Sequence, residues 1–119
     1  MQMAIQNFKK LNLTNIYPKH GIFDVVLPAI LKENGKFDLA FVDGNHRKEA
    51  MLCYFNLLMP YVHEGSIIIF DDIRWSDEMF LGWQEIKNNE NVILSIDLFH
   101  LGIVFFNKKF IKQHFELFY

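Results

Sequence analysis

FDLAFVD (residues 37–43) and SIIIFDD (residues 66–72) are the two stretches that decide the fold. Each is a nearly continuous apolar run that ends in aspartate, and such runs are typical of buried strands in parallel sheets. Strands are therefore expected over the part of each stretch that precedes its aspartates. A helical stretch from Asn45, its expected cap, to about Val62 lies between them. Strand, helix and strand in this order predict a parallel, right-handed crossover unit.

Helices are expected on both sides of this unit. Apolar residues at helical spacing predict a helix over residues 3–11, and residues 15–18 are expected to be extended. Asp24 is the expected cap of a second helix, which stops at Asn34-Gly35. Residues 77–88 form a further amphipathic pattern. Its inward-facing residues are predicted to be Met79, Trp83 and Ile86.

The C-terminal part of the chain predicts more sheet. Residues 92–98 and 103–106 are β-like runs close enough in sequence to form an antiparallel pair. The last ten residues allow two interpretations. Residues 108–113 have helical character, whereas Phe115, Leu117 and Tyr119 alternate as in a strand. The expected fold class is α/β, with a mostly parallel sheet and an antiparallel C-terminal pair.

The composition excludes several classes of protein. A chain of 119 residues with 51% hydrophobic residues is expected to form one domain, residues 1–119. The net charge of -2 offers no basic patch to a nucleic acid and no polycationic segment to a membrane. Cys53 is the one cysteine, which excludes an intrachain disulfide. Without an apolar leader or a long apolar run, we expect a cytoplasmic protein.

Three carboxylates follow the two central strands. Because adjacent parallel strands end at the same edge of a sheet, Asp43, Asp71 and Asp72 are expected to converge there. Hard divalent ions such as Mg²⁺ prefer carboxylate oxygens, so these residues are candidate metal ligands. An equally weighted alternative is that one aspartate caps the following helix and the others are solvated.

Residues next to these carboxylates are candidates for catalysis and substrate contact. His46 follows Asp43 by three residues, and a neutral imidazole there can accept a proton from a substrate hydroxyl. The alternative is a polar residue of the first helical turn in water. Arg74 and Trp75 lie in the loop after the second strand, where open parallel sheets contact their substrates. Trp75 can equally be a packing residue of that loop.

The segments FDLAFVDGNH (residues 37–46) and EGSIIIFDD (residues 64–72) resemble the fourth and fifth strands of class I S-adenosylmethionine-dependent methyltransferases. They look most like the bacterial O-methyltransferase-like branch, in which an Asp-Gly-x-His turn and an acidic pair recur. The resemblance implies a Rossmann-like three-layer sandwich, S-adenosylmethionine as cofactor and Mg²⁺ in metal-dependent members. It places Mg²⁺ on Asp43, Asp71 and Asp72, and the base on His46. The implied cofactor-binding residues are Gly21, Ile22, Phe23 and Asp43.

The resemblance covers the C-terminal half to two thirds of the family domain. The first two strands, the glycine-rich cofactor loop and the acidic residue that holds the ribose are missing, so a truncated domain is expected that is inactive on its own. The family's strand order 3, 2, 1, 4, 5, 7, 6 then leaves the strand at residues 37–42 at an edge. An apolar edge invites pairing, which predicts a homodimer or higher oligomer.

Two functions follow from these expectations. The first is methyl transfer from S-adenosylmethionine to the hydroxyl of a small-molecule acceptor, by a fragment of such an enzyme. The second is a catalytically silent methyltransferase-like module that acts through oligomerisation. The acceptor itself is not encoded in any motif, because loops that differ among members of the family recognise it.

Overall fold

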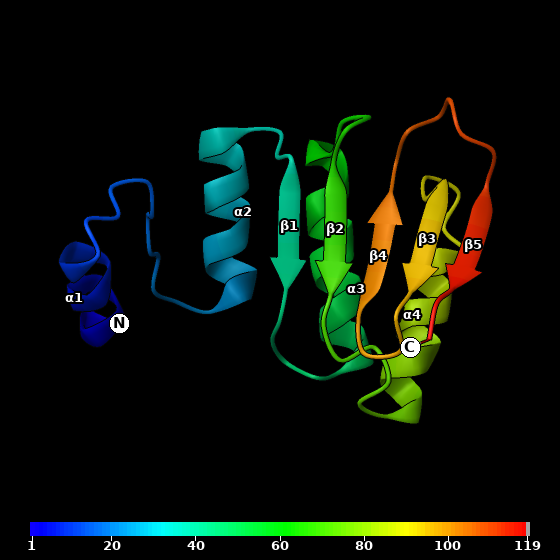
Figure 1. Cartoon of the computed structure of the whole chain (residues 1–119), viewed down its shortest axis with the longest axis horizontal. Coiled ribbons are helices and arrows are strands. Elements are labelled where there is room, and N and C mark those ends of the chain that lie inside the picture. Colours follow the sequence, from blue (N-terminus) through cyan, green and yellow to red (C-terminus); the bar gives the residue numbers. More distant parts are fainter. Residues whose placement is uncertain (119) are drawn as a thin grey trace.

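A computed structural model describes residues 1–118, in which a five-stranded mixed sheet carries helices on one face (Figure 1). The helices are α1 (Gln2–Lys10), α2 (Phe23–Asn34), α3 (Lys48–Leu58) and α4 (Asp77–Lys87), with a 3-10 turn η1 (Met59–Tyr61). The strands are β1 (Leu39–Val42), β2 (Ile67–Phe70), β3 (Leu94–Asp97), β4 (Gly102–Phe105) and β5 (Gln113–Glu116). Their order in the sheet is β1-β2-β4-β3-β5.

The predicted crossover unit is confirmed. β1 and β2 are parallel, with Leu39 opposite Ile67 and Val42 opposite Phe70, and α3 connects them. Backbone hydrogen bonds extend the pairing beyond both ends of the strands. The amide of Ile67 donates to the carbonyl of Asp38 at 2.9 Å, and the amide of Asp71 donates to that of Val42 at 3.0 Å.

The C-terminal strands complete the sheet. β4 lies between β2 and β3 and is antiparallel to both, which confirms the predicted antiparallel pair. β5 pairs in parallel with β3, so residues 113–116 of the ambiguous C-terminal segment form a strand. No helix forms over residues 108–113. Tyr119, which the alternation assigned to the same strand, lies outside the described residues.

The core lies between the sheet and the pair α3 and α4. Met79, Trp83 and Ile86 are buried there, as the helical pattern predicted. From the strands, the buried side chains of Ile68, Phe70 and Val104 face this helix layer. No helix that the structure describes is long and apolar enough to cross a membrane.

Only one face of the sheet is covered within residues 1–118, where a three-layer arrangement was expected. In Figure 1, α3 and α4 lie behind the strands, while α2 lies beside the β1 edge and α1 lies away from the sheet. On β1, Leu39 and Phe41 point to the uncovered face and are 59% and 55% exposed. α1 buries none of its residues. The described residues therefore form two layers.

Two predicted helix caps are wrong. α2 begins after Ile22, and Asp24 lies inside the first turn, where its charge favours the helix N-terminus without capping it. α3 begins after Arg47, which is its cap, because Asn45 adopts a left-handed φ of 52° and lies two residues before that cap. Gly35 does end α2 with a positive φ of 74°, as expected.

Close packing of Trp83 against β4 makes Gly102 a sensitive position. A Cβ atom at Gly102 would lie 2.6 Å from Cζ3 of the fully buried Trp83 ring. We expect Gly102→Ala to lower the free energy of unfolding by about 1–3 kcal/mol, measured by urea denaturation, because the buried ring has no room to shift.

Gly65→Ala is the matched control. A Cβ there would meet the partly exposed ring of His63 at 3.1 Å, and this ring can give way more easily than the buried indole because its partner Asp38 is exposed. We expect a loss under about 1 kcal/mol. Equal losses in the two variants would contradict this account of the Trp83 packing.

Candidate functional site

A small hollow of about 10 Å³, the His46 crevice, lies where β1 and β2 end, and three of the predicted site residues come together around His46, which lines it. His46 Nδ1 lies 3.7 Å from Asp72 Oδ2, and both side chains are partly exposed. The His46 ring stacks on Trp75, with centroids 4.7 Å apart and 23° between the planes. The indole stacks on the imidazole, and Nδ1 is the ring nitrogen that lies near Asp72, at a distance too long for a hydrogen bond.

Two left-handed residues shape the turns that build this crevice. Asn45 and Asp72 each have a φ of 52°, a region that asparagine and aspartate tolerate better than other residues with a side chain. The carboxylate of Asp71 accepts a hydrogen bond from the amide of Asp72 at 2.8 Å. Asp71 therefore stabilises the turn that presents Asp72 to His46.

Asp43 lines a groove between α2 and the edge of β1, with a volume of about 480 Å³. Gly21 and Phe23, two of the other three implied cofactor-binding residues, line the same groove. The third, Ile22, is exposed and is not among the lining residues. Phe23 packs edge-on against Tyr54 of α3, with ring centroids 5.3 Å apart. The groove therefore has an aromatic wall next to a carboxylate.

The three predicted metal ligands do not form a compact set. Within residues 1–118, three ligand atoms lie within 4.8 Å of one another in one group of His, Cys, Asp or Glu residues, and Asp43, Asp71 and Asp72 are not in it. As the side chains lie, the three aspartates do not fit a Mg²⁺ ion. The assignment of Mg²⁺ to them stays a prediction.

Arg74 has an internal partner that the sequence did not indicate. Its guanidinium Nη1 donates to both carboxylate oxygens of the fully buried Asp97, at 2.6 and 2.7 Å. The same group lies over the rings of Phe80 and Phe99, 4.6 and 5.2 Å from their centroids. Arg74 therefore ties the loop after β2 to the end of β3, and its contact with a substrate stays a prediction.

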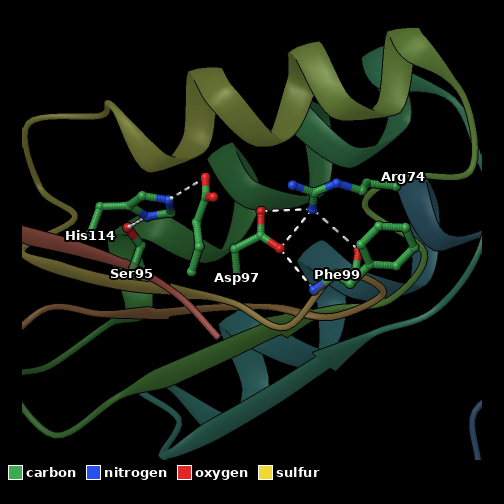
Figure 2. Close-up of polar contacts among 6 residues, drawn as sticks. Arg74, Ser95, Asp97, Phe99 and His114 are labelled. Atoms are coloured by element: carbon green, nitrogen blue, oxygen red, sulfur yellow. Dashed lines mark hydrogen bonds and ion pairs between the residues drawn. The ribbon is translucent and has the colours of Figure 1, made fainter. Parts of the chain in front are cut away.

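Sequence analysis also missed a polar cluster around Asp97 (Figure 2). The group of three potential metal ligands within residues 1–118 is Asp97, His114 and Glu116. Burial lowers the pKa of His114 below its usual value, and the charge of Lys87 lowers it further. The signal was present in the sequence, because LSID (residues 94–97) and QHFE (residues 113–116) each carry polar residues at alternate positions.

The mixed sheet with helices on one face defines the chain as an α/β domain, and the carboxyl edge of its parallel strands is where open α/β sheets bind their ligands. The sequence model of a family described as "Methyltransferase domain" matches residues 4–73, more than half of the chain. The chain belongs to this methyltransferase domain family. The matched residues include His46, Asp71 and Asp72, whereas Asp97 and His114 lie beyond them.

One curated relative is a viral protein. The chain is 32% identical over 64 residues to "Uncharacterized protein R132" of Acanthamoeba polyphaga mimivirus. The match covers 51% of this chain and 29% of the viral protein, so this chain spans under a third of the length of that relative.

Removal of the Arg74 side chain would leave the Asp97 carboxylate buried without its cation. We expect Arg74→Ala to lower the free energy of unfolding by about 3–5 kcal/mol, measured by urea denaturation, because an unpaired buried charge is strongly unfavourable. Lys19→Ala removes an exposed pair with Glu33, whose atoms are 3.9 Å apart, and serves as the control. Its loss is expected to stay under about 1 kcal/mol. A comparable small loss in Arg74→Ala would show that Asp97 does not need the guanidinium.

Proposed function

We propose that the chain is part of an S-adenosylmethionine-dependent methyltransferase that methylates a hydroxyl of a small molecule. It carries the site for that acceptor and the site for the adenine of the cofactor. The observation that carries this proposal is the position of His46 in a crevice beside the Asp43 groove, in a chain of the methyltransferase domain family. The order β1-β2-β4-β3 also supports it, because it equals the order of strands four, five, seven and six that the resemblance implies.

His46 is the proposed base. The acceptor hydroxyl gives its proton to Nε2, and its oxygen becomes the nucleophile. S-adenosylmethionine, when bound, would supply the methyl group from its sulfonium and leave as S-adenosylhomocysteine. The Asp72 carboxylate, 3.7 Å from Nδ1, stabilises the imidazolium that forms, while Trp75 holds the ring in place. No part of this proposal depends on a metal ion.

The Asp43 groove is the proposed adenine site. Its volume of about 480 Å³ falls in the range of small-molecule sites, and the Phe23 ring offers an apolar wall to a base. The six glycines of the chain include no pair spaced as a dinucleotide-type loop requires, so the methionine end of the cofactor has no glycine-rich loop in this chain. We therefore propose that this chain alone binds the cofactor weakly and has no activity.

Titration with S-adenosylhomocysteine, followed by NMR of the full chain, tests the adenine site. We expect shifts at Gly21, Phe23 and Asp43, with a Kd of about 1 mM, which corresponds to roughly 4 kcal/mol of binding free energy. Asp43→Asn should weaken binding severalfold, since it removes the carboxylate from the groove. His46→Gln should leave binding unchanged, because His46 serves the acceptor. An absence of shifts up to about 10 mM, or shifts that map elsewhere, would refute the proposed site.

A second candidate function is a catalytically silent module that acts through self-association. The exposed residues Leu39 and Phe41 of β1 favour it, because they offer apolar surface on the uncovered face of the sheet to a second copy, while α2 lies beside the edge of β1. Both candidate functions are compatible with the same fold, and they differ in whether the Asp43 groove binds the cofactor.

Light scattering after size-exclusion chromatography tests self-association. The unmodified chain is expected to be a dimer or larger at micromolar concentration. Phe41→Lys should shift it to a monomer, since the charge lies on the pairing surface. Leu81→Lys on α4 is the control, because Leu81 has the same exposure of 55% but lies away from β1. A monomeric unmodified chain would exclude the dimer.

A further inference from the structure

Four polar side chains meet on one face of the sheet where β3 pairs with β5. The parallel register sets Ser95 opposite His114 and Asp97 opposite Glu116. Because successive side chains of a strand point to opposite faces, residues two apart share a face. All four therefore lie together, and Ser95 and Asp97 are fully buried on the face that α4 covers. Figure 2 shows His114, Ser95 and Asp97 below this helix.

Asp97 is held rigidly and keeps an unused acceptor position. Its Oδ1 accepts from Arg74 at 2.6 Å and from the amide of Phe99 at 2.8 Å. Its Oδ2 accepts from Arg74 alone, at 2.7 Å. Since each carboxylate oxygen can accept two hydrogen bonds, one lone pair of Oδ2 remains free.

His114 presents a buried nitrogen without a hydrogen-bond partner. Nδ1 lies 2.8 Å from the hydroxyl of Ser95, which holds the ring in place. Nε2 has no hydrogen-bond partner among the residues that the structure describes, although it is buried. The nearest paired oxygen, Glu116 Oε1, is 3.6 Å away and too distant for a hydrogen bond. Buried polar atoms are nearly always satisfied, yet within residues 1–118 this nitrogen has only the long contact with Glu116.

We infer that Asp97, His114 and Glu116 bind a divalent metal ion of the Zn²⁺ class, which fastens β5 to β3. A neutral imidazole and two carboxylates are a ligand set that Zn²⁺ accepts, with water in the fourth position. Ser95 acts as a positioning residue, because a hydrogen bond from Nδ1–H to its hydroxyl leaves the lone pair on Nε2. The two carboxylates are balanced by Arg74 and by the nearby Lys87, so a metal ion would be held by its ligand bonds and not by an excess of negative charge.

The three ligand atoms must move slightly closer together to bind one Zn²⁺ ion. Ligand atoms at about 2.0–2.1 Å from a tetrahedral Zn²⁺ lie about 3.3 Å apart. Those of Asp97, His114 and Glu116 lie within 4.8 Å of one another. Glu116 can supply the movement, since its side chain is half exposed while Asp97 is fixed by Arg74. The inference is independent of the proposed methyl transfer, because the cluster lies beyond the residues that the methyltransferase family matches.

Calorimetry of the full chain with Zn²⁺ tests the site. We expect one Zn²⁺ per chain, and at least a tenfold weaker affinity in Glu116→Gln, which keeps the size of an exposed side chain. His114→Gln should lose binding. The matched control is His63→Gln, since His63 also lies beside a carboxylate, Asp38, but lacks a third ligand. Asp72→Asn should also keep full affinity, which separates this site from the His46 crevice.

Two spectroscopic measurements identify the nitrogen and the effect on the fold. Zn²⁺ should shift the ¹⁵N resonance of His114 Nε2, and should slow amide exchange of β5 at least tenfold relative to the metal-free chain. Both readouts should be absent in Glu116→Gln, whose unchanged circular dichroism would confirm that it folds. The inference is overturned by an absence of Zn²⁺ heat, by undiminished binding in Glu116→Gln, or by an Nε2 resonance that responds to pH but not to Zn²⁺.

Discussion

Parallel pairing of β1 with β2 is the constraint on which the rest of the structure depends. Because Val42 lies opposite Phe70, the chain leaves both strands at the same edge of the sheet. The hydrogen bond from the Asp71 amide to the Val42 carbonyl carries this alignment one residue into the turn. The turn that contains His46 and the turn that contains Asp72 and Trp75 therefore share one crevice. A shift of one residue in this register would turn each apolar side chain of β1 to the other face.

The Arg74–Asp97 pair links this crevice to the end of β3, which lies two strands from β2 at the same edge of the sheet. Arg74 lies in the same loop as Asp72 and Trp75, yet its guanidinium binds a carboxylate at the end of β3. Asp97 has no exposure to water, so the loop is stable only in a position that delivers the guanidinium to it. The same pair fixes the oxygen around which His114 and Glu116 gather. The two candidate sites thus share a single buried ion pair as their support.

The sequence predicted the features that depend on patterns along the chain. Continuous apolar runs identified β1 and β2, and helical spacing identified the buried face of Trp83 on α4. The sequence did not predict where α3 begins, because that depends on backbone conformation. Asn45 is a good cap by residue type, but it adopts a left-handed φ instead. The sequence also failed for Arg74, whose partner lies 23 residues further along the chain and is set by the register of the whole sheet.

The three aspartates at the strand ends do not converge, although the ends of the two strands do. Adjacent parallel strands do bring their termini together, but the direction of each side chain depends on the turn that follows. Asp43 lines the groove beside α2, Asp71 binds the amide of its own turn, and Asp72 approaches His46. Three carboxylates of like charge repel one another, which is a physical reason for their side chains to diverge.

One face of the sheet is uncovered in the described part of the chain, although the sequence of its strands is typical of a sheet that is covered on both faces. Strands that are apolar on both faces, such as β2 with its run of three isoleucines, are typical of sheets that are covered on both sides. Within residues 1–118, helices cover one side, and Leu39 and Phe41 remain exposed on the other. Burial of such surface is worth about 25 cal/mol per Å², so a second cover would be strongly favourable. Each proposed function supplies such a cover. In the methyltransferase it is another part of the fold, and in the self-associating module it is a second copy of this chain. The choice between them depends on the Asp43 groove, because only a methyltransferase needs that groove open to a cofactor.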